Sequence, residues 1–528
     1  MSGFCVRGLR ILAVPPQPVA RRDNSRNGIH CSLPRGTFFK TETMSLRIFL
    51  ILGMLLGVVA SNILYAADDP LAGNNPYRRL FLDAMVVEES QGLTRIFHSA
   101  EKYKGNPVVP KDKPWEGWGP YQYGTVLWDE GKLKMWYSCI GTDSGYTCYA
   151  ESQDGIKWTK PNLGVIDFKG SAANNIAGTM GLPSVMKLSD NRWAMYSWGG
   201  KKGPWVAFSE DGLRWTEGKT ELFKSSDVVN FFYDPYREQY VSTYKTPNRR
   251  HRAVGIALSK DGIEWSKPVE GAVVGADDLD PDASQFYGMP VFPYQGMYIG
   301  LPWIYHARWM KYGIYDSPSK MHEAQEGSPC TVDVQMAWSW NLIQWTRTPE
   351  RKPFIALGPE GSWDDGMIYT ARAPVIVGDK LYFYYGGFDK IHDEYKDVHG
   401  AIGLATLRLD GFCSMHTDGK EGWLISRREV FRTPRITINA VTGKDGYVTA
   451  ELLDRNDNII PGFSRNDCIP FKGDSIRYLM RWKTAEFPKK LVDADKKIRF
   501  FLKNADLYSY LPSDIDMAKD DGKVWTVR

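Results

Sequence analysis

A pattern of short strand-like runs that recurs five times along the chain constrains the fold more than any other feature of the sequence. Each copy has three runs of β-branched and aromatic residues separated by turn residues, which is the pattern of antiparallel β-strands. In the first copy these runs cover residues 124–128, 133–139 and 146–151. Each copy then ends in an Asp-Gly-x-x-Trp motif or a variant of it, beginning at Asp154, Asp211, Asp261, Asn341 and Asp410.

These five copies predict a β-propeller, because repeated four-stranded units are typical of propellers, with one blade for each unit. We therefore expect an all-β fold in which a five-bladed β-propeller covers residues 79–425. The Asp-Gly pair of the motif suits a tight turn, and its tryptophan is expected to pack between neighbouring blades. A strand at residues 80–87 or 93–98, which lies outside the copies, is expected to complete the last blade.

The pattern changes from residue 429 onward. Short alternating runs separated by Asp, Gly and Asn turns cover residues 435–439, 447–453, 475–482 and 497–503. Alternation of this kind predicts strands that each bury one face. We expect a small β-sandwich over residues 429–515, followed by a polar tail over residues 516–528.

Residues 44–67 have the three parts of a secretory signal peptide. Arg47 lies in a short basic region, residues 48–60 form an apolar core, and the small residues Ala66 and Ala67 follow at the exit. Residues 1–43 are irregular and rich in arginine, and Met44 is a natural start, so we interpret them as a spurious extension. A secreted or periplasmic protein is therefore expected. An uncleaved anchor is the alternative, and no other run is a candidate membrane span.

The net charge of +4 depends on this N-terminal region. The first 66 residues carry eight Lys or Arg and two Asp or Glu, so the chain without them has a net charge of −2. Nucleic acid is therefore not an expected partner. Five cysteines follow this region, and a cross-strand disulfide between Cys139 and Cys148 is open to them. No spacing of Cys and His resembles a metal site, and neither a metal nor another cofactor is predicted.

The innermost strand of each propeller blade lines a shared funnel, so residues just before these strands converge although they are far apart in sequence. Acidic residues stand before four of the five predicted inner strands. Converging carboxylates suit glycoside hydrolysis, in which one protonates the leaving oxygen and another activates water or attacks the anomeric carbon. The predicted catalytic residues are Glu116, Asp227, Asp282 and Asp365. The predicted substrate-binding residues are Trp115, Trp118, Tyr121, His306, Arg372 and His392.

A structural interpretation competes with the catalytic one at several of these positions. Residues 277–282 also suit a solvated acidic loop, and Asp364-Asp365-Gly366 also suits a turn. His306 and His392 follow second strands and are equally able to cap them. Arg372 is suited to hold a substrate carboxylate, a sulfate or a catalytic acid.

The five copies, the signal peptide, the funnel carboxylates and the trailing β-sandwich together resemble the five-bladed propeller glycoside hydrolases. These are the invertases, levansucrases, arabinanases and β-xylosidases of families 32, 43 and 68. The stretches at residues 154–164, 286–294 and 361–369 carry the resemblance. The Asn-Asp-Pro-Asn-Gly and Glu-Cys-Pro motifs of invertases are absent, and Phe232-Tyr233-Asp234-Pro235 has Tyr where the related motif has Arg. The resemblance therefore implies the fold without assigning the catalytic residues.

The sequence thus predicts a secreted carbohydrate-active protein, with a glycosidase as the leading hypothesis and an oligo- or polysaccharide as the substrate. A non-catalytic glycan-binding propeller is one alternative, and it predicts carboxylates that are far apart or neutralised by cations. A structural or interaction propeller is another, and it predicts a funnel filled with apolar side chains. The fold alone does not choose among them.

Overall fold

The computed structural model describes residues 76–513, apart from 142–144, 180, 200–202, 249–250, 282, 308–328, 393, 395, 432–434 and 484–493. The predicted extension, signal peptide and C-terminal tail, and the predicted catalytic residue Asp282, lie outside the described residues. Strands dominate the described part, and its one short helical element is the 3-10 turn η1 (Pro114–Glu116). No helix in this part is long and apolar enough to cross a membrane.

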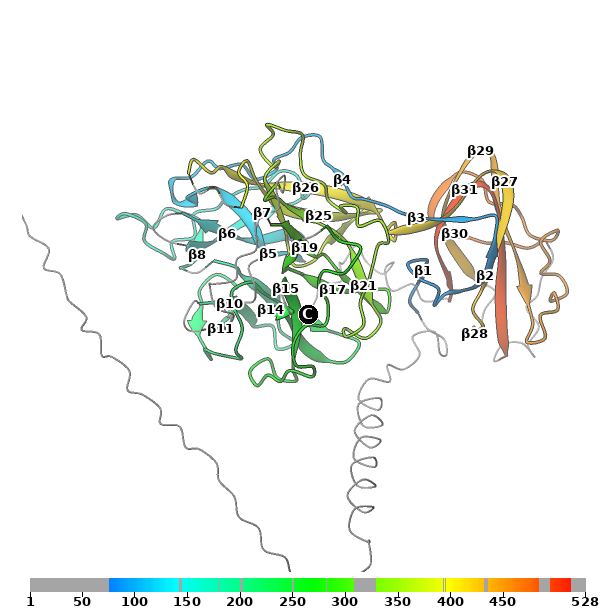
Figure 1. Cartoon of the computed structure of the whole chain (residues 1–528), viewed down its shortest axis with the longest axis horizontal. Coiled ribbons are helices and arrows are strands. Elements are labelled where there is room, and N and C mark those ends of the chain that lie inside the picture. Colours follow the sequence, from blue (N-terminus) through cyan, green and yellow to red (C-terminus); the bar gives the residue numbers. More distant parts are fainter. Residues whose placement is uncertain are drawn as a thin grey trace, which may run out of the picture. The chain divides into compact units, whose positions relative to one another are not determined.

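Four separate antiparallel sheets follow one another along the chain (Figure 1). The first sheet contains β5 (Pro120–Asp129), β6 (Lys132–Ile140), β7 (Gly145–Ser152) and β8 (Ile176–Gly178). The second contains β9 (Ser184–Lys187), β10 (Trp193–Trp198), β11 (Pro204–Ser209) and β12 (Thr216–Glu217). The third contains β13 (Val229–Asp234), β14 (Gln239–Asn248) and β15 (His251–Ser259). The fourth contains β17 (Val291–Tyr294), β18 (Met297–Gly300), β21 (Ala337–Ser339) and β22 (Thr346–Arg347).

The inner strands of these sheets are in contact in chain order, β5 with β9, β9 with β13 and β13 with β17. This is the arrangement of propeller blades, so the prediction of an all-β propeller is confirmed. Five blades are not confirmed, because the structure has four separate blades. The strands of the fifth copy lie within a larger, eight-stranded sheet. That sheet contains β4 (Glu101–Lys102), β16 (Ser284–Gly288), β19 (Trp303–His306), β20 (Val332–Val334), β23 (Met367–Thr370), β24 (Val375–Val377), β25 (Lys380–Phe388) and β26 (Gly400–Arg408).

Two prolines explain why the fourth and fifth copies do not remain separate. The fourth copy breaks between β16 and β17 at Pro290 and between β18 and β19 at Pro302, and proline has no N–H to donate to a ladder. The carbonyl of Pro290 accepts from Leu301 N at 2.9 Å, and that of Pro302 accepts from Gln335 N at 2.9 Å. One half of each strand forms the fourth blade. The other half joins the fifth copy, because β20 pairs in parallel with β23.

The repeated motif is a turn, as predicted from its residue types. In the first copy Asp154 Oδ1 accepts from the backbone N–H groups of Ile156 and Lys157 at 2.8 Å each. Gly155 has a φ of +76°, which favours glycine. Trp158 packs edge-on against Tyr384 of the fifth copy, with ring centroids 5.4 Å apart. The motif therefore closes a turn and places an aromatic ring between two copies.

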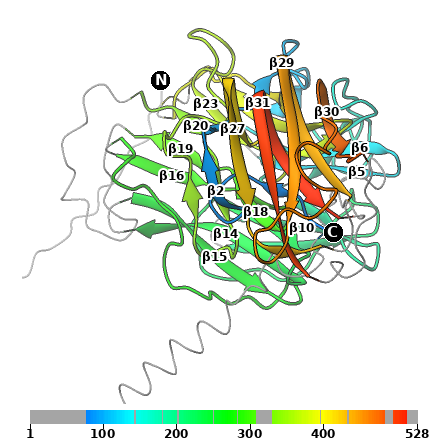
Figure 2. The ribbon, with the colours of Figure 1, turned by 90° about the vertical axis from the view of Figure 1, so that its right-hand side faces the viewer.

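The C-terminal strands form one eight-stranded sheet, in the order β2–β27–β31–β29–β30 (Figure 2). Its long strands are β27 (Cys413–Ser426), β29 (Ile436–Leu453) and β31 (Asp495–Pro512), and its shorter strands are β1 (Arg79–Leu80), β2 (Val87–Gln91), β3 (Thr94–Phe97), β28 (Glu429–Val430) and β30 (Asp474–Leu479). The predicted β-sandwich is not confirmed, since hydrogen bonds connect these strands into a single sheet. The N-terminal strands β1, β2 and β3 pair with β31 and β27, so they do not complete the last blade as expected. Instead β4 pairs with β26 of the fifth copy.

A buried ion cluster around Asp410 ties this sheet to the repeats. Asp410 Oδ2 lies 3.1 Å from Arg78 Nε and 2.9 Å from Arg477 Nη1, and Tyr294 donates to Oδ1 at 2.7 Å. Although burial raises the pKa of Asp410, the two guanidinium groups outweigh burial and hold the pKa below its usual value. Asp410 is the first residue of the fifth copy of the motif, so in this copy the motif aspartate connects the repeats to the C-terminal sheet.

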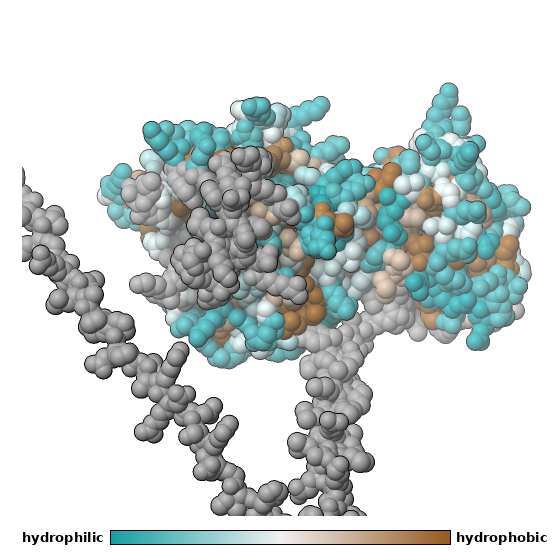
Figure 3. Space-filling model, viewed as in Figure 1, coloured by the Kyte–Doolittle hydropathy of each residue, from teal (hydrophilic) through white to brown (hydrophobic). Residues whose placement is uncertain are grey.

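The described surface is mainly polar, and hydrophobic residues are scattered over the face shown in Figure 3. Five large apolar side chains of the described residues are exposed, namely Met85, Tyr103, Leu279, Ile459 and Ile469. Single exposed apolar side chains are normal for a globular protein.

Candidate functional site

Five tyrosines from four strands meet where the copies converge, and we call them the tyrosine cluster: Tyr121, Tyr123, Tyr287, Tyr305 and Tyr369. Tyr123 and Tyr369 stack with ring centroids 5.0 Å apart, and Tyr287 lies 5.6 Å from Tyr369. The strands that carry them are β5, β16, β19 and β23, which belong to the first, fourth and fifth copies. Burial raises the pKa of Tyr121, Tyr123 and Tyr369 well above the ordinary value, so these phenols stay neutral.

Two cations lie over the cluster from the third blade. Lys245 Nζ is 4.9 Å from the ring centroid of Tyr287. Arg252 Cζ is 5.8 Å from the same ring and 5.7 Å from that of Tyr305. Both distances are within the range of cation–π attraction. Burial lowers the pKa of Lys245, and the neighbouring carboxylate of Asp227 opposes that effect. One side of the cluster is therefore positively charged.

Asp227, a predicted catalytic residue, lies at this charged side. Its Oδ1 is 2.5 Å from Lys245 Nζ, and its side chain is 43% exposed, whereas that of Lys245 is 5% exposed. Asp227 is thus a carboxylate beside an aromatic cluster, with part of its surface open to a ligand.

A second carboxylate, Asp333, lies on the strand next to β19, with its side chain on the other face of the sheet from Tyr305. Asp333 on β20 pairs in register with Ile304, next to Tyr305, and its Oδ2 is 2.7 Å from His306 Nε2. Its Oδ1 is buried and has no hydrogen-bond partner. Asp333 is not among the site residues predicted from the sequence. The signal available was a lone acid between two valines in Val332-Asp333-Val334, at a position where a strand normally buries an apolar side chain.

Of the two predicted histidines, His392 lies at the cluster, whereas His306 pairs with Asp333. The ring of His392 is 4.4 Å from that of Tyr305 and 5.2 Å from that of Tyr287, measured between centroids. The structure therefore brings together Asp227, Tyr121 and His392 from the predicted set, and adds Lys245 and Arg252. His306 and Asp333 pair with each other on the neighbouring strands β19 and β20.

Glu116 is not in this group, and its surroundings indicate a structural carboxylate. It is 0% exposed, and its Oε1 accepts from Lys160 Nζ at 2.5 Å and from Tyr137 OH at 3.1 Å. Its Oε2 accepts from the backbone N–H groups of Asp112 at 2.9 Å and Lys113 at 3.0 Å. Four donors occupy this buried carboxylate, so none of it is left for a substrate.

The predicted tryptophans beside Glu116 pack into the protein. Trp115 Nε1 donates to Asn175 Oδ1 at 2.7 Å, and its ring lies 5.8 Å from that of Phe168. Trp118 is half-buried against the core, and its backbone N–H donates to the carbonyl of Ile140 at 2.9 Å. Trp115 therefore packs within the first blade, whereas Trp118 packs against the core that contains Tyr121.

Asp365 is part of a turn, which was the competing interpretation of its sequence. Its Oδ2 accepts from Gly361 N at 2.6 Å. The neighbouring Asp364 is buried, and it pairs with Lys102 Nζ at 2.6 Å and accepts from Tyr385 OH at 2.8 Å. Neither carboxylate contacts the cluster through these bonds.

The acidic loop ahead of β16 is neutralised by arginines. Asp280 has a 1% exposed side chain, and its Oδ1 accepts from Arg347 Nη2 at 2.7 Å. Asp277 also pairs with an arginine, Arg351. Asp282 itself lies outside the described residues. The described part of the loop is therefore held by charge pairs rather than solvated.

Arg372 is buried rather than presented to a substrate. It is 3% exposed, its Nη1 donates to the carbonyl of Phe231 at 3.0 Å, and its Nε has no partner. Burial lowers the pKa of Arg372 to about 9. No described carboxylate pairs with it, so Arg372 does not hold a catalytic acid among the described residues.

The described residues contain no group of three or more His, Cys, Asp or Glu side chains placed to hold a metal ion. Cys139 and Cys148, the pair for which a disulfide was open, are buried free thiols. Burial raises the pKa of the Cys139 thiol, so it is a poor nucleophile. The chemistry of the site therefore comes from carboxylates, imidazoles, cations and tyrosines.

Comparison with known proteins gives distant structural similarities. No protein-family model matches the chain, and no curated protein matches it. A glycosyl hydrolase from Bacteroides ovatus is 15% identical and covers 59% of this chain and 94% of its own, with a TM-score of 0.42. A β-1,2-mannobiose phosphorylase from Listeria innocua is 13% identical and covers 58% and 96%, with a TM-score of 0.39. A member of the GH130 family of mannoside phosphorylases, which contains glycoside hydrolases that target β-1,2-mannosidic linkages in Candida mannan, is 16% identical and covers 59% and 94%, with a TM-score of 0.41.

Proposed function

We propose that the protein is a carbohydrate-active enzyme that hydrolyses a glycosidic bond at the tyrosine cluster. The observation that carries the proposal is a partly exposed carboxylate, Asp227, beside a group of aromatic rings, with a second carboxylate, Asp333, on the strand next to β19. Tyrosine faces suit the apolar faces of sugar rings, and paired carboxylates are the usual machinery of glycoside hydrolysis.

The two carboxylates have different partners, which suits different roles. Asp227 is paired with an ammonium group and partly exposed, so in this proposal it is the base or nucleophile. Asp333 is the second carboxylate to be tested, because it lies on the strand beside Tyr305 and one of its oxygens has no partner. In the first step the C–O glycosidic bond breaks, a proton passes from the general acid to the leaving oxygen, and water or Asp227 forms the new bond to the anomeric carbon.

Tyr287, Tyr305 and His392 form the surface that receives the sugar. Their mutual ring contacts fix them in place, and Lys245 and Arg252 complete one edge. A hydroxyl-rich or anionic sugar unit would find donors at this edge. Asp282, outside the described residues, is retained in the proposal as a further acidic residue at the same end of β16.

The test is hydrolysis of a panel of aryl glycosides and plant or algal polysaccharides by the wild type and by Asp227→Asn and Asp333→Asn. Asp365→Asn is the matched control, because it changes a turn carboxylate that is half-buried like Asp227. The proposal expects turnover of at least one substrate, lost in the first two variants and kept in the control. Turnover that survives both substitutions would refute the assignment of these carboxylates.

A non-catalytic glycan-binding protein is a second candidate. Charge pairing of Glu116, Asp227 and Asp280 with Lys160, Lys245 and Arg347 favours it, since neutralised carboxylates were its expected feature. Saccharide binding without turnover of any panel substrate, with loss of binding in Tyr287→Ala, would decide for this candidate.

The remaining expectations about this protein extend the proposal. We propose that the chain is secreted through the signal at residues 44–67, and that it belongs near the five-bladed families 32, 43 and 68. The strands β24, β25, β26 and β4 would then act as the fifth blade, which is supported by the contact of β24 and β25 with β5. N-terminal sequencing of the protein from the culture medium or periplasm tests secretion, and a start at or near Ala67 or Asp68 is expected.

A further inference from the structure

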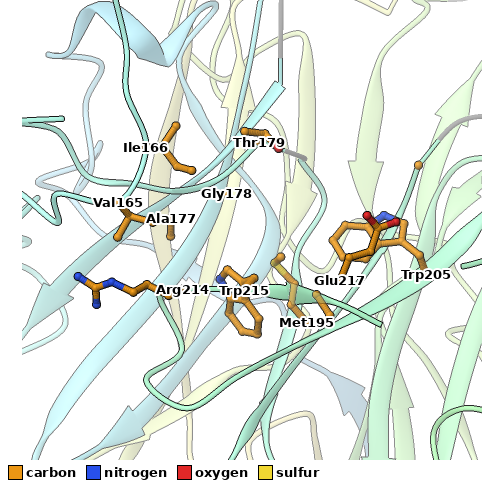
Figure 4. A pocket seen from close by; sticks show the side chains of 12 residues that line it. Val165, Ile166, Ala177, Gly178, Thr179, Met195, Trp205, Arg214, Trp215 and Glu217 are labelled. Carbon is orange, nitrogen blue, oxygen red and sulfur yellow. The ribbon is translucent and has the colours of Figure 1, made fainter. Parts of the chain in front are cut away.

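A cavity lies between the outer parts of the first two blades, away from the tyrosine cluster. Its volume is about 510 Å³, within the range of small-molecule sites. The residues that line it are Val165, Ile166, Ala177, Gly178, Thr179, Met195, Gly199, Trp205, Ala207, Arg214, Trp215 and Glu217. Figure 4 shows Trp215 and Met195 between Arg214 on one side and Trp205 with Glu217 on the other. The lining thus combines apolar surface and two tryptophans with charged groups at opposite sides.

Trp215 differs from its counterparts in the other copies of the motif. Trp158, Trp265 and Trp345 each donate their indole N–H to the carbonyl three residues earlier, at 3.2, 3.1 and 2.8 Å. In the second copy that carbonyl belongs to Gly212, and it accepts from Trp136 Nε1 at 2.7 Å instead. The indole N–H of Trp215 is therefore buried without a hydrogen-bond partner.

The indole of Trp205 is a second unpaired donor in the lining of the cavity. The indole N–H of Trp205 is also buried without a partner, and the residue is 7% exposed. A buried unpaired donor costs about 1–3 kcal/mol, so an acceptor that reached these two indoles would stabilise this part of the protein. The three other copies that contain the motif tryptophan bond its indole N–H internally, so the fold itself does not impose this cost.

We propose that this cavity is a second binding site and that its ligand is a saccharide. A sugar has C–H faces that pack on tryptophan rings and hydroxyl oxygens that accept from indole N–H groups. Glu217 and Arg214 stand at the rim, as an acceptor and a donor for the remaining hydroxyls. A purely apolar ligand would bury both indole donors and the charged rim without pairing them.

This site is separate from the proposed catalytic function. Its lining comes from β8, β10, β11, β12 and the adjoining loops, and it shares no residue with the tyrosine cluster. The cavity would bind a sugar even if the cluster were not catalytic. It would add a second point of attachment for a longer saccharide.

The test is isothermal titration and saturation-transfer NMR of the full chain with D-xylose, L-arabinose, D-galactose, D-mannose and their β-linked disaccharides. Trp215→Phe keeps the ring and removes the indole N–H, so it is expected to weaken binding about tenfold. Trp265→Phe is the matched control, because it removes an indole N–H that is bonded within its own motif. It is expected to leave binding unchanged.

Gly178→Leu provides an independent test by filling the cavity. A Cβ at Gly178 would meet Thr147 Cβ at 3.5 Å and Met195 Cε at 3.8 Å, which are ordinary contacts, so the variant is expected to fold. It should abolish saccharide binding at this site, while Tyr287→Ala at the cluster should not. The proposal is overturned if no sugar of the panel binds, if binding is unchanged in both Gly178→Leu and Trp215→Phe, or if 4-nitrophenol binds there and sugars do not.

Discussion

Asp227 and Glu116 both precede an inner strand, and each lies 2.5 Å from a lysine ammonium. They differ in their exposure to solvent and in the number of donors that surround them. Glu116 is 0% exposed and receives four donors, whereas the side chain of Asp227 is 43% exposed and its one described ion pair is with Lys245. A saturated buried carboxylate stabilises a fold, and a partly open one beside aromatic rings is available for chemistry.

The comparison teaches that position at a strand entrance does not assign a role. Propeller topology brought both residues to the inner end of a blade. The local loop then decided the outcome, because the backbone N–H groups of Asp112 and Lys113, just before η1, donate to Glu116, whereas only Val228 separates Asp227 from β13. Substitution of Asp227 is therefore expected to affect activity, and substitution of Glu116 is expected to affect stability.

The largest effect is expected for Asp227→Asn. Removing the charge of the proposed base or nucleophile should reduce kcat/KM by about 10³ or more, with a melting temperature close to that of the wild type. Steady-state kinetics on the best substrate of the panel measures it. A kcat/KM within tenfold of the wild type would show that Asp227 is not catalytic and does not differ in role from Glu116.

Glu116→Gln should act on stability instead. The change leaves the ammonium of Lys160, whose side chain is 8% exposed, with only the half-exposed Asp112 as a charged partner. Loss of one member of a buried pair is expected to lower the free energy of unfolding by about 3 kcal/mol. Urea denaturation measures this loss, and kcat of the folded fraction should be unchanged. A selective loss of kcat at full stability would make Glu116 catalytic after all.

Asp280→Asn tests a third carboxylate through the pH dependence of the free energy of unfolding. Although burial raises the pKa of Asp280, Arg347 and Arg351 outweigh burial and hold the pKa below its usual value. Since the folded pKa lies below the unfolded one, the stabilisation is present above the unfolded value and is lost as the pH falls through the folded one. The variant should be about 3 kcal/mol less stable than the wild type at neutral pH. The difference should shrink at about pH 3, and a constant difference in urea denaturation would contradict the charge explanation.

The smallest effect is expected for Asp365→Asn. The carboxylate accepts one backbone N–H in a turn, and an asparagine oxygen accepts it equally well. The free energy of unfolding should change by less than about 0.5 kcal/mol, and kcat/KM by less than about twofold. A large loss of activity in this variant would show that Asp365 is catalytic.

Much of the propeller was predictable from the sequence, because strand runs and turn motifs at regular intervals leave few alternatives. The number of blades was not. Pro290 and Pro302 divide the fourth copy, and the sequence does not show which half of a divided strand joins which neighbour. The single C-terminal sheet was equally hidden, since its partners β2 and β27 are far apart in the chain.

The site was predictable in part for a related reason. The sequence places Asp227 and His392 beside strands of the repeats, and topology alone brings such residues together. The burial of Glu116 was not predictable, because its partner Lys160 is 44 residues away and reaches it through tertiary contacts. Asp333 was missed because a lone acid inside a strand-like run looks like part of the ladder, and only the register beside Tyr305 shows its neighbour.

The pairing of β1 with β31 has a consequence for how the molecule is made. Arg79 and Leu80 pair with Tyr510 and Ser509, near the end of the described chain, and Arg78 lies against Asp410. A ribosome therefore releases the first strands of this sheet long before their partners exist, and contacts so distant in sequence form slowly. The sheet is completed only when synthesis is nearly finished, so the earliest residues to emerge are among the last to settle into place.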